Sequence, residues 1–385
     1  MPQFFDAHLD LAYLAEVGRD MHAPLDDCRG RLLPASITLP SLRDGGVRAC
    51  LGTIFTEAIA PDGTTDTPEA SYPEGDALAA WRAGMRQLKL YQAWAEAGVI
   101  ELLPKRPSNT ASPHEAGTPS AESFRAADAP LLLGILMECA DPIETPEQLD
   151  EWADAGVIAI GMAWWRGSRY AGGNGLGGPL TDAGRDLATR MDELGVVHDL
   201  SHLSQHATDD LLAHTDRVVI ASHSNCRALL DGEANPDWQR HLSDETIAEI
   251  GTRGGIVGLN LVRNFIRTGL KRNDPNDRPT IDEAVAHVEH VCELMGHRRG
   301  VGLGTDMDGG ITADELPRGI DTPSDLPKLC DAARQPRVER RRHPRLRVGQ
   351  LGEVLGAGVA RSLRAPAYLA ARRASSAQCA HQSTG

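Results

Sequence analysis

Short apolar runs recur along the chain, and polar residues or glycine close each of them. Several runs are continuous rather than alternating, which is typical of strands that are buried on both faces. The eight runs are Phe4–Ala7, Val47–Phe55, Leu131–Met137, Val157–Ala163, Val196–Leu200, Val218–Ala221, Gly255–Leu259 and Gly300–Gly304. We therefore expect eight buried strands.

Helical patterns lie between these runs and carry terminal signals. Thr145-Pro-Glu-Gln148 predicts a capping box with proline at the first helical position. Thr280-Ile-Asp-Glu283 predicts a second box, which opens a helix to about Met295, and Gly296 supplies its stop. Thr181 predicts the cap of a further helix.

Strands and helices that alternate over roughly 300 residues predict a (β/α)8 barrel of the TIM type, with a doubly wound open sheet as the alternative. Two long segments, near 58–75 and 104–128, are rich in Pro, Gly, Ser, Thr and acidic residues. We expect them to be insertions around the barrel mouth rather than domain linkers.

The composition narrows the function classes. The chain has 385 residues, 41% of them hydrophobic, so it can bury a substantial core. A net charge of −15 and only 4% aromatic residues disfavour nucleic acid as a partner. The seven cysteines are scattered without a CxxC pair, and neither a signal peptide nor a membrane span is evident. We expect a cytoplasmic protein with no membrane partner.

The composition changes abruptly near Arg334. Residues 334–385 contain eleven arginines, no lysine and two acidic residues. We therefore divide the chain into a barrel domain, 1–333, and an atypical arginine-rich tail, 334–385. A reading-frame shift in the source sequence is our hypothesis for the tail, and sequencing an intact frame would refute it. The alternative is a basic arm that binds nucleic acid or a partner, which the lack of lysine and of interleaved aromatic residues disfavours.

Metal-capable side chains follow five of the eight runs. His8 and Asp10 form an HxD pair, whose side chains point to the same side of an extended chain. Glu138 directly follows an apolar run, where burying a carboxylate is costly without a metal or a charged partner. His198-Asp-Leu-Ser-His202, Ser222-His223 and Gly304-Thr-Asp306-Met-Asp308 follow three more runs. Because barrel active sites lie at the C-terminal ends of the strands, we expect these side chains to meet.

Histidine and carboxylate ligands without cysteine favour Zn2+ or a similar divalent ion in a hydrolytic site. Two ions would need a bridging group, and none of the four lysines ends a candidate strand. A carboxylate must therefore bridge, and Glu138 is the candidate.

Other motifs are weaker. Gly173-Asn-Gly175-Leu-Gly-Gly178 matches GxGxxG by spacing, but it does not follow a strand directly, so we expect a flexible loop near the mouth. His198 falls inside a strand run and is expected to be structural. Cys139 and Cys226 flank candidate ligands and are expected to be core thiols.

Together, several of these motifs resemble one known family. They are His8-x-Asp10, Glu138, Asp199-Leu-Ser-His202, Ser222-His223-Ser224-Asn225 and Gly304-Thr-Asp306-Met-Asp308-Gly. Over about residues 4–334 the chain resembles the membrane (renal-type) dipeptidases, the M19 metallopeptidases. The resemblance implies a (β/α)8 barrel with two zinc ions that activate a water to cleave dipeptides. Some members accept a D residue at the C-terminal position, and a homodimer is expected from the resemblance alone.

The resemblance also implies roles for individual residues. His8 and Asp10 would bind one zinc, His202 and His223 the other, and Glu138 would bridge both. Asp306 resembles the acid that takes the proton of the bridging water and passes it to the leaving amine.

Two positions concern the substrate. Arg240, before Leu242-Ser-Asp244, resembles the arginine that grips the substrate carboxylate, and the alternative is a surface arginine. Trp164 falls where many relatives have a histidine that contacts the substrate, and its indole offers one N–H donor. Trp164 leaves one alternative open, which is hydrolysis of another small amide, such as an N-acyl amino acid or a lactam. A second alternative comes from the unusual tail, and it is an inactive barrel that acts as a binding protein because the tail does not close it.

Overall fold

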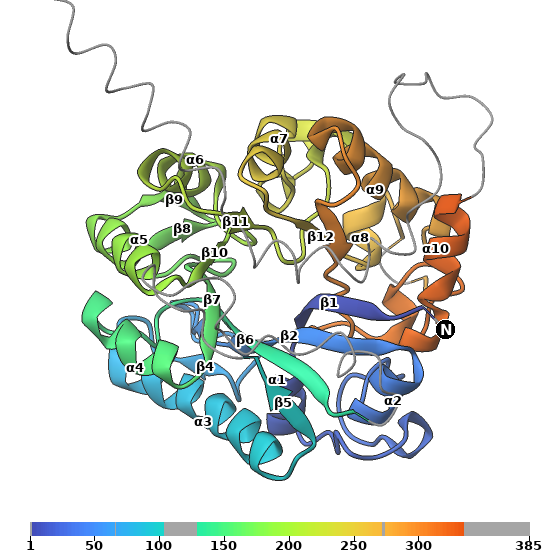
Figure 1. Cartoon of the computed structure of the whole chain (residues 1–385), viewed down its shortest axis with the longest axis horizontal. Coiled ribbons are helices and arrows are strands. Elements are labelled where there is room, and N and C mark those ends of the chain that lie inside the picture. Colours follow the sequence, from blue (N-terminus) through green and yellow to red (C-terminus); the bar gives the residue numbers. More distant parts are fainter. Residues whose placement is uncertain (1, 66, 104–128, 272–273, 335–385) are drawn as a thin grey trace, which may run out of the picture.

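Eight parallel strands form a ring in the computed structural model, which describes residues 2–65, 67–103, 129–271 and 274–334 (Figure 1). Their order around the ring is β11-β10-β7-β6-β2-β1-β13-β12, and a bridge between Ala221 and Val257 links the two ends. The strands are β1 (Phe4–Leu9), β2 (Val47–Phe55), β6 (Leu131–Glu138), β7 (Val157–Gly161), β10 (Val197–Asp199), β11 (Val219–Ile220), β12 (Val257–Leu259) and β13 (Val301–Leu303). Each overlaps one of the eight predicted runs, and β1 and β6 extend one or two residues beyond theirs. The predicted barrel is therefore confirmed, and the open sheet is wrong.

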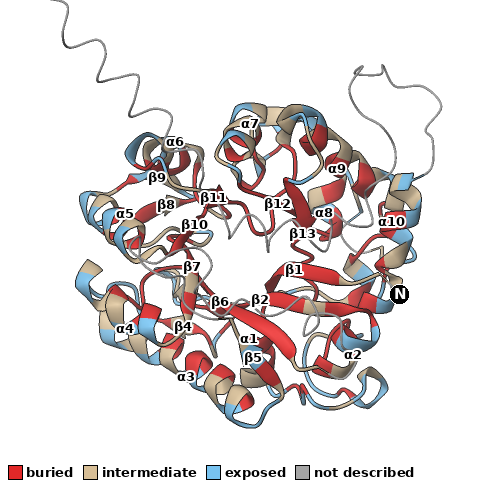
Figure 2. Ribbon diagram, in the orientation of Figure 1, coloured by how far each residue is buried: buried red, intermediate tan, exposed pale blue. Residues whose placement is uncertain are grey.

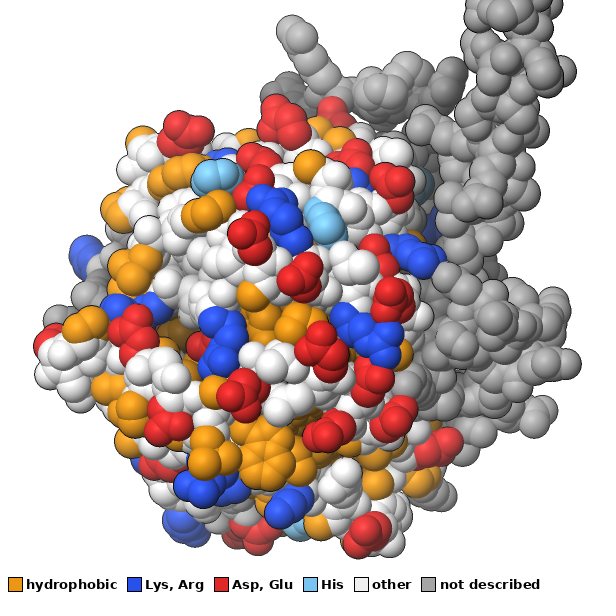
Figure 3. Space-filling model, turned by 90° about the vertical axis from the view of Figure 1, so that its left-hand side faces the viewer, with side chains coloured by type: hydrophobic (Ala, Val, Ile, Leu, Met, Phe, Trp, Pro, Cys, Tyr) orange, Lys and Arg blue, Asp and Glu red, His pale blue; other side chains and the backbone are white. Residues whose placement is uncertain are grey.

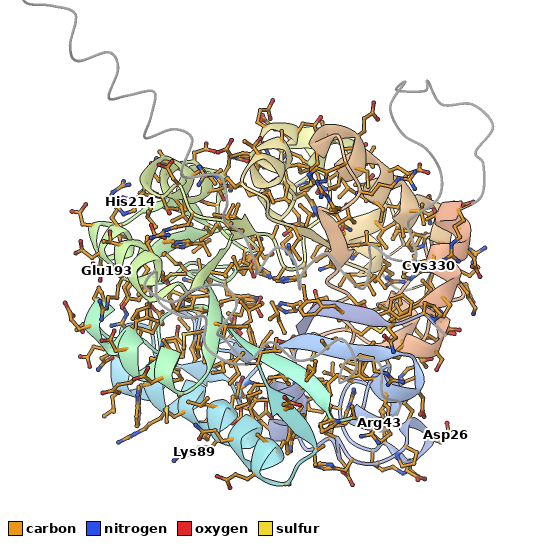
Figure 4. All side chains as sticks on the ribbon, in the orientation of Figure 1. Asp26, Arg43, Lys89, Glu193, His214 and Cys330 are labelled. Carbon is orange, nitrogen blue, oxygen red and sulfur yellow. The ribbon has the colours of Figure 1, made fainter. Side chains whose placement is uncertain are left out.

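Helices surround this ring (Figure 1). They are α1 (Leu11–Glu16), α2 (Leu39–Asp44), α3 (Ala77–Glu96), α4 (Leu149–Asp154), α5 (Asp182–Leu194), α6 (Gln205–His214), α7 (Asp244–Thr252), α8 (Arg263–Ile266), α9 (Ile281–Met295) and α10 (Pro327–Arg334). The exposed side chains of Lys89, Glu193 and His214 point outward from three of them (Figure 4).

Several short elements decorate the barrel. A further strand, β5 (Ile100–Leu102), pairs with β6 outside the ring and was not predicted. Two small sheets join β3 (Glu57–Ala58) to β4 (Ser71–Tyr72), and β8 (Ala171–Gly173) to β9 (Gly177–Leu180). Short 3-10 turns span Leu25–Asp27, Pro146–Gln148, Arg227–Leu229, Gly232–Ala234, Trp238–Arg240, Ala313–Glu315 and Pro323–Asp325. The predicted loop at 104–128 lies outside the described residues.

Two of the three predicted helix starts are confirmed. Thr181 caps α5, and the box of Thr280 and Glu283 caps α9, which ends at left-handed Gly296 (φ 68°). The capping box predicted at Thr145 is wrong, because the Thr145 side chain caps no helix. Residues Pro146–Gln148 form a 3-10 turn, and α4 begins only at Leu149. The Gln148 side chain accepts from the backbone N–H of Glu144 instead, at 2.8 Å.

The strands of the ring are mostly buried (Figure 2), and two main hydrophobic clusters contact them. The larger one packs the outer faces of the strands against the helices. A smaller one includes Phe5, Leu51, Leu136 and Val197, from strands on different sides of the ring, and such residues can meet only inside it. This interior core fills the barrel beneath its mouth.

The surface carries mixed charge. On the face in Figure 3, acidic and basic side chains alternate with hydrophobic ones, and no continuous basic stripe is visible there. Over the described ranges, no helix combines the length and apolar character needed to cross a bilayer.

Candidate metal centre

The strand order brings the predicted site residues to one mouth. His8 lies near the end of β1, Glu138 is the last residue of β6, and His202, His223 and Asp306 each lie three residues beyond a strand end. Parallel strands end on the same side, so these side chains face a common space. His8, Glu138, His223 and Asp306 are buried, and His202 is partly buried, with 11% of its side chain exposed.

Glu138 stands at the centre of the cluster. Its Oε2 atom lies 3.3 Å from His8 Nε2, and its Oε1 atom lies 3.1 Å from His202 Nε2 and 3.5 Å from His223 Nε2. The two latter nitrogens are 2.9 Å apart. One carboxylate therefore contacts three imidazoles through its two oxygens.

A second group of possible ligands adjoins the first. His8 Nε2 lies 3.7 Å from Asp10 Oδ1 and 4.0 Å from Asp306 Oδ1. Two sets of three ligand atoms close enough for one ion are His8, Glu138 and His223, and His8, Asp10 and Asp306. The residues predicted from the sequence thus meet, with Asp306 among them.

The hydrogen bonds of two imidazoles orient them toward this centre. His202 Nδ1 lies 2.9 Å from Asn174 Oδ1, and His223 Nδ1 lies 2.8 Å from Ser222 Oγ. The amide oxygen only accepts, and the Ser222 hydroxyl donates to Asp199, so both Nδ1 atoms carry the proton. Both Nε2 atoms then present lone pairs to Glu138.

This donor set fits a cation. Two imidazole lone pairs 2.9 Å apart, next to a carboxylate oxygen, repel one another unless a positive charge lies among them. Neutral imidazole and carboxylate are the ligands that Zn2+ takes in hydrolytic sites. The residues therefore fit one or more divalent ions.

The pKa values reflect the same demand for positive charge. Burial raises the pKa of Asp10 to about 6 and that of Asp306 to about 7, and neighbouring carboxylates add to both shifts. Burial opposes protonation of His8, but Glu138 and the two aspartates outweigh it and raise the His8 pKa to about 10. Burial and the nearby Arg240 charge lower the pKa of His202 to about 4.

The backbone is unusual at this mouth. Cys139, His202 and Asp306 have φ values of 70°, 66° and 59°, a left-handed conformation that non-glycine residues rarely adopt. Such residues persist only where the surrounding structure holds them, and they cluster at functional sites.

Sequence reasoning missed several supporting residues. Asn260 Nδ2 donates to Asp306 Oδ2 at 2.9 Å, and the Thr53 hydroxyl donates to Asp10. Asn260 directly follows a predicted strand, so searching strand ends for amides as well as for acids and histidines would have found it. Thr53 lies within a strand, and only the packing of β1 beside β2 reveals its partner.

Arg240 lies beside the cluster and is buried, so the alternative of a surface arginine is wrong. Its NH1 group donates to Ser224 Oγ at 2.9 Å, and its NH2 group donates to the His223 carbonyl at 2.8 Å. Its buried Nε–H has no partner among the described residues. Two hydrogen bonds thus fix the guanidinium, and its Nε–H group can still donate to a ligand.

Trp164 lies at the edge of the site, half-buried. Its ring centre is 5.1 Å from that of Phe55 and 5.8 Å from that of His202. An apolar ring therefore stands next to a predicted metal ligand.

The weaker motifs are accounted for. His198 pairs with Asp192 at 2.8 Å and is structural, as predicted, and Cys139 and Cys226 are buried free thiols. The glycine-rich segment at 173–178 spans the turn of the antiparallel hairpin β8–β9, which was not predicted, and it lies next to His202; its expected flexibility stays a prediction.

Comparisons with known proteins agree with this geometry. A family model described as membrane dipeptidase (peptidase family M19) matches residues 2–340. An uncharacterised protein in the pqqA 5′ region of Klebsiella pneumoniae is 34% identical over 170 residues, which are 42% of this chain and 59% of that protein. An uncharacterised dipeptidase of Schizosaccharomyces pombe is 34% identical over 150 residues, which are 39% of this chain and 32% of that protein. The match thus spans less than two thirds of either relative.

A solved structure is similar in fold. The crystal structure of a metallopeptidase from Rhodobacter sphaeroides, bound to a phosphinate mimic of the dipeptide L-Ala-D-Ala, has a TM-score of 0.63 and 23% identity. The likeness covers 86% of this chain and 92% of that one.

Proposed function

The chain belongs to the membrane dipeptidases, peptidase family M19, and from this membership and the site we propose that it is a zinc-dependent dipeptidase. The reaction would be hydrolysis of the single peptide bond of a dipeptide. The observation that carries the proposal is Glu138, whose two carboxylate oxygens lie within 3.5 Å of three imidazole nitrogens.

Five residues would hold the metal in this proposal. They are His8, Asp10, Glu138, His202 and His223. Two ions shared through Glu138 would lower the pKa of a water molecule and polarise the scissile carbonyl. The hydrogen bonds that their Nδ1–H groups donate to Asn174 and Ser222 would keep two of the imidazoles oriented for this role.

Asp306 is proposed to transfer a proton from the attacking water to the leaving amine. Asn260 holds its Oδ2 atom, so its Oδ1 atom faces the cluster, 4.0 Å from His8 Nε2. A carboxylate with a raised pKa in this position suits a general base that takes a proton from the attacking water and returns it to the leaving amine.

Arg240 is proposed to bind the free carboxylate of the substrate. It is buried, its guanidinium is already oriented by Ser224 and by the His223 carbonyl, and its Nε–H is unpaired in the described part of the chain. A pocket borders both Arg240 and His202. A carboxylate bound at Arg240 would limit the substrate to a short peptide whose scissile bond is adjacent.

Trp164 supports a second candidate. Its indole lies 5.8 Å from the His202 ring, at the position where many relatives have a histidine, and this difference supports a substrate with a different acyl group. The alternative activity is hydrolysis of another small amide, such as an N-acyl amino acid or a lactam, at the same metal site.

The test is hydrolysis of a panel of L-L and L-D dipeptides, N-acyl amino acids and lactams by the zinc-loaded full chain. We expect dipeptide cleavage that a chelator abolishes and zinc restores. Glu138→Gln should lose activity by more than the roughly 10–100-fold that loss of a ligand's outer partner costs. Glu101→Gln, an exposed residue on β5, is the matched control and should retain activity.

Three outcomes separate the candidates. Cleavage of amides but not of dipeptides would select the second candidate. A folded chain that binds about two zinc ions and cleaves nothing would refute both and leave a binding protein. A folded chain that binds no metal would refute the metal centre itself. A cytoplasmic setting and a homodimer remain predictions, which fractionation and the solution mass would check.

A further inference from the structure

The glycine-rich hairpin β8–β9 is joined to the segment that carries His202. Gly173 forms an antiparallel bridge with Leu203, and the Ser204 N–H donates to the Gly172 carbonyl at 2.9 Å. The hairpin therefore runs along the chain just after His202, and its turn begins at Asn174.

Asn174 contacts His202 at two points. Its backbone N–H donates to the His202 carbonyl at 2.9 Å, and its side-chain Oδ1 accepts from His202 Nδ1 at 2.9 Å. Asn174 is itself buried. One contact supports the left-handed backbone of His202 (φ 66°), and the other fixes the plane and the tautomer of its ring.

The glycines explain why the hairpin can come so close. A Cβ atom on Gly173 would lie 2.0 Å from the Trp164 carbonyl oxygen, and one on Gly175 would lie 2.3 Å from the Trp165 ring. The Gly175 N–H also donates to the Trp165 carbonyl at 2.7 Å. Side chains at these positions would push the hairpin, and Asn174 with it, away from His202.

We propose that Asn174 is a positioning residue that holds the His202 imidazole for metal binding, and that the glycine-rich hairpin exists to place it. This inference rests on the proposed function in so far as that function requires a metal at His202. The amide oxygen accepts a hydrogen bond from Nδ1–H, so the proton of the neutral ring is on Nδ1. The lone pair of Nε2 then faces Glu138 Oε1, at a distance of 3.1 Å. An apolar side chain at position 174 would leave the ring free to rotate or to change tautomer.

The experiment measures metal affinity rather than activity. Zinc dissociation constants, from competition with a chromophoric chelator, are compared for the wild type, Asn174→Leu, Asn174→Asp and Leu176→Ala. Leu176 is exposed in the same turn and serves as the control. The visible spectrum of the cobalt-loaded proteins reports the ligand set directly, and the unfolding temperature of the metal-free proteins reports folding.

We expect Asn174→Leu to bind zinc roughly 10–100-fold more weakly with an altered cobalt spectrum. Asn174→Asp keeps an acceptor for Nδ1, so it should bind like the wild type or more tightly, and Leu176→Ala should match the wild type. If Asn174→Leu does not fold, Asn174→Ala removes the acceptor without adding apolar bulk and takes the same test.

Two results would overturn the inference. One is a folded Asn174→Leu or Asn174→Ala variant with wild-type affinity and spectrum. The other is an Asn174→Asp variant as weak as Asn174→Leu, which would mean that packing rather than the acceptor matters. A wild-type chain that binds no zinc would instead refute the proposed function on which the inference rests.

Discussion

The two halves of the barrel mouth hold their metal-capable side chains in different ways. At the ends of β1 and β13, one imidazole, His8, lies within 4.0 Å of the carboxylates of Asp10 and Asp306. Beyond the ends of β10 and β11, two imidazoles, His202 and His223, lie beside each other, and no aspartate among the described residues contacts their Nε2 atoms. Glu138 contacts both halves.

The supports differ as well. Asn174 and Ser222 accept from the Nδ1 atoms of His202 and His223, whereas the buried Nδ1 of His8 has no partner within the described ranges. The first half is therefore set by charge, which the pKa of about 10 for His8 reflects, since its carboxylate neighbours outweigh the effect of burial. The second half is set by neutral hydrogen bonds from loops. All of these residues thus lie at or just beyond the C-terminal ends of barrel strands, but two kinds of interaction orient their side chains.

The largest effect on activity should come from a change at Asp306, in the half of the mouth that also contains His8 and Asp10. We call this half the charged half. Asp306→Asn keeps the size of the side chain but removes the base, so we expect kcat to fall by about 10²–10⁴-fold. Zinc content should stay at the wild-type value, because Asp306 is assigned to proton transfer rather than to metal binding. Kinetics and metal analysis of the same preparation check both expectations.

A loss of zinc in Asp306→Asn would change the assignment. It would make Asp306 a ligand together with His8 and Asp10, as their shared geometry permits. Asp282→Asn, an exposed residue on the first turn of α9, is the matched control and should change neither kcat nor zinc content.

The barrel and the meeting of the predicted ligands could be predicted from the sequence, because both follow from the strands. A buried strand leaves an apolar run, and the residue at its end faces the mouth whatever the loops do. His8, Glu138 and Asp306 were placed by this rule alone. Asn260 was missed only because amides were not searched for.

The orienting residues could not be predicted in this way. Asn174 lies in a hairpin whose packing on Trp164 and Trp165 depends on backbone proximity, and the sequence shows only a row of glycines. The Ser222 hydroxyl is aligned by Asp199 on the neighbouring strand, which requires the sheet register. The box at Thr145 failed for a related reason, since Gln148 found the N–H of Glu144 instead.

An intermediate effect, on metal affinity, is expected in the half of the mouth that contains His202 and His223, which we call the neutral half. Ser222→Ala removes the acceptor of His223 Nδ1 and leaves the buried Asp199 with one donor fewer. We expect zinc affinity to fall about 10–100-fold, measured by chelator competition. Ser36→Ala is the control, because Ser36 is also buried and its hydroxyl has no partner in the described structure.

Ser222→Ala with unchanged affinity would break the comparison. It would show that His223 is oriented by its surroundings, for example by the stacked His8 ring at 3.5 Å, and not by its Nδ1 contact.

The smallest effect on the site, and one that appears in stability, concerns the support of the neutral half by α9. His287 Nδ1 accepts from the Cys226 N–H at 3.2 Å, and its Nε2 donates to the Ile266 carbonyl at 3.1 Å. Cys226 lies three residues after His223, so this imidazole anchors the loop that carries the ligand. A doubly protonated ring could not accept from Cys226 and would break the anchor.

The direction of the pH dependence follows from the His287 pKa. Burial, with a smaller contribution from nearby His290, lowers this pKa from 6.5 to about 4 in the folded chain. Between these values the unfolded chain binds a proton that the folded chain does not, so stability is full above pH 6.5 and is lost as the pH falls toward 4. The loss attributable to His287 is on the order of 3 kcal/mol.

Urea unfolding of metal-free protein from pH 7.5 to pH 4.5 measures this loss, with the wild type compared with His287→Gln. The variant should be less stable at pH 7.5, because glutamine fits the site less well, but its stability should fall less steeply because it cannot titrate. His22→Gln, an exposed position, should keep the wild-type slope. His241 is also buried, and the charge of His287 contributes to its lowered pKa, so the difference in slope includes this coupling. Equal slopes of stability against pH for His287→Gln and the wild type would show that the neutral half does not depend on an uncharged His287. The contrast between the two halves would then rest on Asn174 and Ser222 alone.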